Sequence, residues 1–91
     1  MNKSIWKFPL EYTDLQIISV PKNSKPIAVG EQNGTIMMWM EVDVSKEKKD
    51  MKVLVVGTGY EYDSSGLKFI GTTIMSNGLV WHVFAEVGVE E

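Results

Sequence analysis

The sequence predicts an all-β fold, a small antiparallel sandwich or barrel of about seven strands formed by a single domain over residues 1–91. Two Asn-Gly pairs, each lying between apolar runs, are typical of tight hairpin turns. The remaining segments are short and alternating or rich in β-branched residues. No stretch of about ten residues has the 3.6-residue period of an amphipathic helix.

Two short strands are predicted near the N-terminus. Residues 4–10 place an apolar side chain at every second position and include Pro9. Proline cannot donate to a sheet ladder, so we expect an edge strand here. Residues 15–20 form the next strand, which ends at Pro21 and a turn-rich stretch.

The first Asn-Gly pair, Asn33-Gly34, joins residues 26–32 to residues 35–43 in a hairpin. A two-residue type I′ loop fixes the register by counting back from the turn. One side, expected to be a core face, pairs Val29 with Met38 and Ile27 with Met40; the other pairs Ala28 with Trp39 and Gly30 with Met37.

A charged loop and a buried strand separate the two hairpins. Residues 46–50 form a charge run, which we interpret as a solvated loop, and residues 51–57 predict a central strand buried on both faces. One short helical turn is possible around residues 63–67.

The second Asn-Gly pair, Asn77-Gly78, joins residues 67–76 to residues 79–86. The same counting pairs Ile74 with Trp81, Thr72 with Val83 and Ile70 with Ala85 on a second core face. The reverse side, expected to be half buried, carries Phe69, Gly71, Thr73 and Met75 against Val80, His82, Phe84 and Glu86.

Composition excludes several classes of protein. Twelve acidic and nine basic residues give a net charge of −3, so we expect no nucleic-acid partner. The chain has no cysteine and therefore no disulfide or thiolate metal site. No obvious signal sequence and no run of about 18–20 apolar residues is present, so we expect a cytoplasmic protein without a membrane partner.

Gly57-Thr58-Gly59 is the first candidate binding element. A glycine-flanked threonine can expose backbone amides to a phosphate. The alternative is that the glycines only shape a bend where a strand leaves the sheet. The spacing matches neither a dinucleotide-binding fingerprint nor a Walker loop.

The single histidine, His82, lacks a local partner for catalysis. Glu86 lies four residues away, roughly 13 Å along a strand, which is too far to orient a general base. We therefore expect a structural or ligand-binding His82, half buried opposite Thr73. The carboxylate pairs Glu41/Asp43 and Glu61/Asp63 could bind a hard cation, but solvated faces explain them, and we expect no metal site.

Three tryptophans have different expected places. Trp6 and Trp81 have apolar neighbours on their strand faces and are expected in the core. Trp39 lies on a face that changes from apolar to acidic, so it is an oligomer anchor, a ligand shelf or a packed lid. A 91-residue chain cannot cover every apolar face alone, so we expect a homo-oligomer with Trp39 in or near its interface.

Four motifs in this order resemble a family of small, uncharacterised proteins encoded by phages and prophages. They are Ile5-Trp6-Lys7-Phe8-Pro9-Leu10, Gly57-Thr58-Gly59, Gly66-Leu67-Lys68-Phe69-Ile70-Gly71-Thr72 and Trp81-His82-Val83-Phe84. The chain departs from the family pattern at Tyr60, where a histidine is common. The resemblance implies no catalytic residue, and it implies a phage origin with a counter-defence role in the host cytoplasm.

The function expected from these observations is non-enzymatic binding without a cofactor. The first hypothesis is sequestration of a small nucleotide-derived host signalling molecule. Its candidate ligand-binding residues are Thr58, Gly59, Tyr60, Tyr62, Lys68, Trp39 and His82, with Lys7 as a second possible cation. The second hypothesis is inhibition of a host defence protein through exposed sheet surface. No nucleophile with a plausible base emerges, so an enzyme is not expected.

Overall fold

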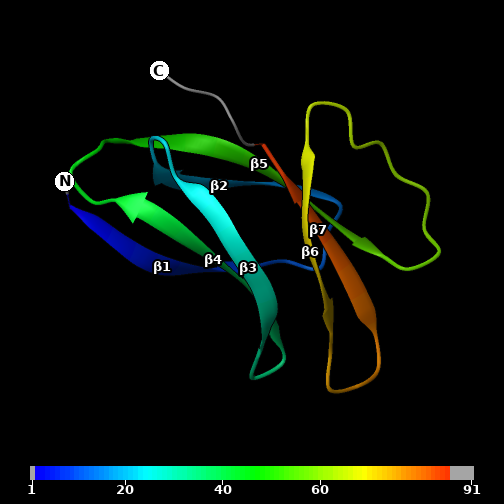
Figure 1. Cartoon of the computed structure of the whole chain (residues 1–91). Coiled ribbons are helices and arrows are strands. Elements are labelled where there is room, and N and C mark those ends of the chain that lie inside the picture. Colours follow the sequence, from blue (N-terminus) through cyan, green and yellow to red (C-terminus); the bar gives the residue numbers. More distant parts are fainter. Residues whose placement is uncertain (1, 87–91) are drawn as a thin grey trace.

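The computed structural model describes residues 2–86, in which seven strands form two antiparallel sheets that pack as a sandwich (Figure 1). The strands are β1 (Lys3–Leu10), β2 (Leu15–Pro21), β3 (Lys25–Gln32), β4 (Thr35–Asp43), β5 (Lys48–Gly57), β6 (Lys68–Ile74) and β7 (Val80–Ala85). One sheet has the order β1-β4-β3 and the other β2-β5-β7-β6. The all-β prediction is confirmed; within the described residues the sandwich is open rather than a closed barrel, and there is no helix.

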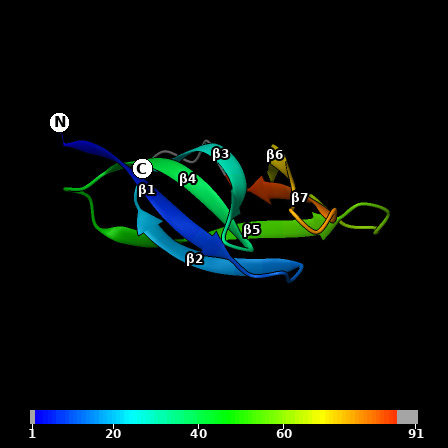
Figure 2. The same ribbon diagram turned by 90° about the horizontal axis from the view of Figure 1, so that it is seen from below.

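The core lies between the two sheets, which Figure 2 shows edge-on as two layers. Alternate residues of each strand point inward, as the period of two requires. The buried core cluster comprises Leu10, Val20, Ile36, Met38, Met40, Val42, Met51, Val53, Val55, Met75, Val83 and Ala85. Trp6 and Trp81 are partly buried and pack against this cluster, in agreement with their expected place.

Two strand predictions concern position within a sheet, and both are confirmed. β5 is internal, between β2 and β7, and its residues from Val53 to Gly57 are buried whichever face they point to. β1, which contains Pro9, is an edge strand. The charge run at 46–50 is only partly a loop, because β5 already begins at Lys48.

The first Asn-Gly pair forms the predicted type I′ turn, with positive φ at both Asn33 (52°) and Gly34 (82°). The predicted pairs from Ala28 to Gly30 are confirmed. The pairing of Ile27 with Met40 is wrong. A bulge between Pro26 and Ala28 pairs Pro26 with Met40, and Ile27 is left exposed.

The second Asn-Gly pair makes a longer turn than predicted. Only Gly78 has positive φ (90°), its amide donates to Met75 O at 2.9 Å, and the Met75 amide donates to Leu79 O at 2.8 Å. These bonds define a three-residue loop, a type I turn followed by a left-handed glycine. The register is therefore shifted by one residue from the predicted one.

This shift reverses the predicted faces of β6 from Thr72 to Met75, whereas beyond the bulge Phe69 faces outward and Ile70 packs against the core, as predicted. Ile74 pairs with Val80 rather than Trp81, and Thr72 pairs with His82 rather than Val83. Thr73 and Met75 are consequently buried, whereas Ile74 is exposed. His82 faces Thr72 and not Thr73, which corrects the expected neighbour. The Ile70–Ala85 pair is also absent, because a bulge between Phe69 and Gly71 leaves Ile70 without a partner.

The two sheets meet where β3 passes β6 (Figure 1). A Cβ built on Gly71 would lie only 2.9 Å from Val29 Cγ2, so glycine permits this close approach. Near the hairpin tips, the Glu31 carboxylate accepts hydrogen bonds from the Ser76 amide at 2.6 Å and the Ser76 hydroxyl at 2.9 Å. Residues 2–86 contain no helix long and apolar enough to cross a membrane.

Candidate functional site

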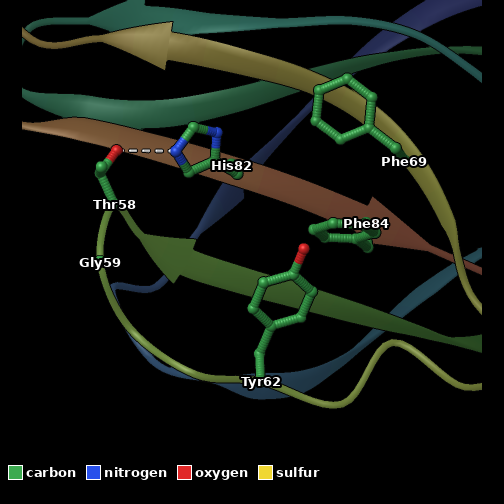
Figure 3. Close-up of a pocket in the computed structure, with 6 residues that line it drawn as sticks. All are labelled: Thr58, Gly59, Tyr62, Phe69, His82 and Phe84. Atoms are coloured by element: carbon green, nitrogen blue, oxygen red, sulfur yellow. Dashed lines mark hydrogen bonds between the residues drawn. The ribbon is translucent and has the colours of Figure 1, made fainter.

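A cavity of about 450 Å³ lies on the outward side of the four-stranded sheet, where the chain leaves β5 (Figure 3). It is lined by Thr58, Gly59, Tyr62, Phe69, His82 and Phe84. Three segments of the chain supply these residues. The loop that joins β5 to β6 contributes the first three, and the outward positions of β6 and β7 contribute the others.

Phe84 is the centre of the aromatic wall. Its ring centroid lies 5.1 Å from that of Tyr62 and 5.5 Å from that of Phe69, and both neighbours are tilted against it. These distances and angles match the preferred geometry of aromatic pairs. The bulge in β6 helps to make the wall, because it places Phe69 directly opposite Phe84.

His82 lies beside this wall and uses both ring nitrogens. Nε2 is 2.8 Å from the Thr58 hydroxyl, and Nδ1 is 2.9 Å from the Thr72 hydroxyl. In neutral histidine one nitrogen donates and the other accepts, and a threonine hydroxyl can fill either role. The imidazole thus bridges the loop and β6 through two threonine hydroxyls.

The structure brings together four of the seven candidate ligand-binding residues: Thr58, Gly59, Tyr62 and His82. Tyr60 lies instead at a second cavity of about 340 Å³, which Leu79 and Trp81 also line. Lys68 is exposed on β6 and does not line the first cavity. Trp39 is on the outward face of the other sheet, where its ring lies against Gly30.

The glycine-flanked turn offers fewer amides than its sequence suggests. The Thr58 amide donates to Val80 O at 3.3 Å, and the Tyr60 amide donates to Gly57 O at 3.2 Å. Gly59 has a φ of +93°, which favours glycine. β5 ends at Gly57, so the glycines shape the exit from the sheet, and most of the amides around the turn are already hydrogen-bonded.

The candidate cation ligands do not cluster. Within residues 2–86 no group of three His, Asp or Glu side chains could hold a metal ion. Asp43 and Asp63 each accept bonds from the serine two residues later, and these hydrogen bonds lower the pKa of both carboxyls. The segment around Asp63 is a turn closed by a bond from Leu67 N to Ser64 O rather than the helical turn considered above.

Phe69 and Phe84 are the lining residues that sequence reasoning did not select. Both were assigned to the mixed reverse side of the second hairpin. The sequence offered one signal for these two residues, because both phenylalanines lie on the same side of the second hairpin as His82.

A family model described as "Domain of unknown function (DUF7352)" matches residues 1–91. The chain belongs to this family. No curated protein and no solved structure matches it.

Proposed function

We propose that this DUF7352 chain is a non-enzymatic binding domain whose cavity holds a flat aromatic group, the base of a small nucleotide-derived signalling molecule. The observation that carries the proposal is the aromatic wall of Tyr62, Phe69 and Phe84 beside a polar edge at Thr58. Aromatic side chains bind bases by stacking, which is worth about 1–3 kcal/mol per base. A small number of polar groups then orients the ligand.

The state of His82 supports binding without turnover. A general base needs a lone pair within reach of the proton that it removes. In a catalytic hydroxyl–imidazole pair a third group, usually a carboxylate, orients the base; here the Thr72 hydroxyl contacts Nδ1 of His82, and no carboxylate lines the cavity.

The same lining favours the base over the phosphate as the recognised part. No lysine is among the six lining residues, and the Thr58 amide already has a backbone partner. A phosphate would therefore find few charge-assisted partners at this cavity. We expect a nucleoside to bind about as well as its nucleotide.

The resemblance to phage and prophage proteins gives the proposal its biological setting. A phage-encoded domain that removes a host signal from the cytoplasm would act as a counter-defence protein. Stoichiometric capture requires tight binding and no catalytic group, which fits the chemistry proposed for this cavity.

The test is ligand retention followed by release. Protein is mixed with adenosine, AMP, a cyclic nucleotide and ADP-ribose, filtered, and then heat-denatured so that any bound compound can be identified. We expect intact recovery of compounds that contain the base. Recovery of a converted product would instead indicate an enzyme.

Two tyrosines of one loop provide matched variants. Tyr62→Ala removes part of the aromatic wall and should weaken binding by about 5-fold to 150-fold, the equivalent of about 1–3 kcal/mol. Tyr60→Ala removes a tyrosine that lines the other cavity and should leave binding unchanged. Equal losses in both variants would contradict the assignment of the site.

A second candidate function is inhibition of a host protein. It is favoured by exposed apolar side chains, among them Ile17 and Ile74, beyond the cavity on the same sheet. Failure of every compound to be retained, together with capture of a host protein that Phe69→Ala abolishes, would support this alternative.

A further inference from the structure

The four-stranded sheet exposes an apolar surface around the cavity. The strand register places four outward-facing residues in one row across the sheet, one from each strand. They are Leu15 of β2, Leu54 of β5, Phe84 of β7 and Phe69 of β6. Ile17 and Ile74 lie on the same side, on the two edge strands. We call the surface formed by these six residues the pocket face.

The pocket face exposes several large apolar side chains to solvent. Leu15, Ile17, Phe69 and Ile74 are 56%, 60%, 57% and 73% exposed. An aromatic side chain has roughly 150–250 Å² of surface and an aliphatic one somewhat less. These four side chains and Tyr62, which borders the pocket face on the loop after β5, therefore leave on the order of 500 Å² of apolar surface open. One partner in a standard protein interface contributes about 800 Å². The patch is therefore the right size for the centre of such an interface.

The strand edges are poorly suited to association. The three prolines of the chain, Pro9, Pro21 and Pro26, each lie on an edge strand: β1, β2 and β3. The fourth edge strand, β6, contains the bulge between Phe69 and Gly71. Prolines and bulges interrupt the ladder that a neighbouring strand would need. A partner is thus expected to bind a face of the sandwich.

We propose that a second copy of this chain docks on the pocket face around a two-fold axis and closes the open side of the cavity. A two-fold interface uses one patch twice, so the patch must be self-complementary. Beyond its apolar row, the same side of the sheet carries both signs of charge, at Asp50, Lys52 and Glu86. Opposite charges from the two copies can therefore meet at the rim.

The dimer rests on the proposed function in one respect. Small-molecule sites bury about 70–90% of their ligand. The cavity lies on an outward sheet face, between the loop after β5 and the outward side chains of β6 and β7, and it is open toward solvent. A second pocket face would supply the missing cover, so the binding site would be complete only in the dimer.

The opposite face of the sandwich provides the competing interface. It carries Trp39, the residue expected near an interface from the sequence, but the Trp39 ring packs against Gly30 and is half buried. Ile5 of β1 and Ile27 of β3 are exposed large residues of that sheet, at 62% and 52%. Ile5 and Ile17 are thus a matched pair, with the same side chain and nearly equal exposure on edge strands of opposite sheets.

The experiment measures mass by sedimentation velocity at tens of micromolar protein, for the wild type and for Ile17→Lys, Ile74→Lys and Ile5→Lys. We expect a wild-type dimer. Either lysine on the pocket face should weaken the dimer at least 10-fold, because a charge would be buried without a partner. Ile5→Lys should leave the dimer unchanged. Circular dichroism confirms that each variant is folded.

A monomeric wild type would overturn the proposal, and so would loss of the dimer in Ile5→Lys with its retention in Ile17→Lys. Ligand retention separates this inference from the proposed function. A monomer that still retains the base-containing compounds would refute the dimer alone. A pocket-face dimer that retains none of them would refute small-molecule binding alone.

Discussion

Gly71 lies where the two sheets approach most closely, and alanine at this position should destabilise the fold. The added Cβ would lie 2.9 Å from Val29 Cγ2, and the valine methyl cannot move away easily because its χ1 is restricted. Overpacking of this kind costs about 1–3 kcal/mol. Alanine recovers about 0.4–1 kcal/mol by reducing the entropy of the unfolded chain. The net loss in the free energy of unfolding is therefore about 0.5–2 kcal/mol.

Thermal and urea unfolding measure this loss directly. In a domain of this size, 1 kcal/mol corresponds to a shift of about 4–8 °C in Tm. Gly30→Ala is the matched control. Its Cβ would lie 3.4 Å from the Trp39 ring, which is not a severe clash, and the substitution reduces the entropy of the unfolded chain by the same amount. We expect Gly30→Ala to be neutral or slightly stabilising.

The double variant Val29→Ala/Gly71→Ala isolates the contact. Removing the valine methyls should relieve the clash, so the cost of Gly71→Ala should fall sharply in the Val29→Ala background. An equal cost in both backgrounds would refute the argument that β3 and β6 pack at this point.

The remaining predictions concern turns and pH. Gly34→Val and Gly78→Val should each lower Tm more than a surface substitution does. The φ angle is positive at both positions, and a β-branched residue rarely adopts positive φ. Unchanged Tm values would contradict the turn geometry. Hydrogen bonds from Ser45 lower the pKa of Asp43 from its ordinary 3.8, so their stabilisation is complete above pH 3.8 and is lost as the pH falls through the lower folded-state pKa. The difference in Tm between wild type and Ser45→Ala should accordingly shrink between about pH 7 and about pH 2, and a constant difference would count against this linkage.

The strands were predictable because their boundaries are set by local chemistry. Asn-Gly pairs, prolines and β-branched runs act within a few residues, and all seven predicted strands exist. The turn at Asn77-Gly78 was not predictable from the pair alone, because Asn-Gly fits both a two-residue type I′ loop and a three-residue loop with a left-handed glycine. The tip of this hairpin is also held by Glu31, 45 residues away from Ser76. Such a contact exists only after the sheets have packed.

Only part of the candidate site could be predicted, because the sequence shows the chemistry of each residue but not the contacts that form when the sheets pack. The chemistry of Thr58, Tyr62 and His82 was visible in the sequence, but their neighbours depend on register. One extra residue in the turn and one bulge in β6 pair Phe69 with Phe84 and Thr72 with His82. Tyr60 and Tyr62 line different cavities because of the path of one loop, which no periodicity encodes.

For the base binding proposed above, the two threonines on His82 would limit how sharply the cavity distinguishes one base from another. If Thr58 donates to Nε2, the Thr58 oxygen can only accept from a ligand; if it accepts from Nε2–H, its own proton is free to donate. Thr72 takes the opposite role at Nδ1. A change of tautomer therefore adapts the edge at Thr58 to either a donor or an acceptor on a bound base, so under the proposed function stacking on the aromatic wall would supply most of the affinity. We expect adenosine and guanosine to differ in Kd by less than the loss caused by Tyr62→Ala, as measured by calorimetry. A larger preference between the two bases would show that hydrogen bonding, rather than stacking, dominates recognition.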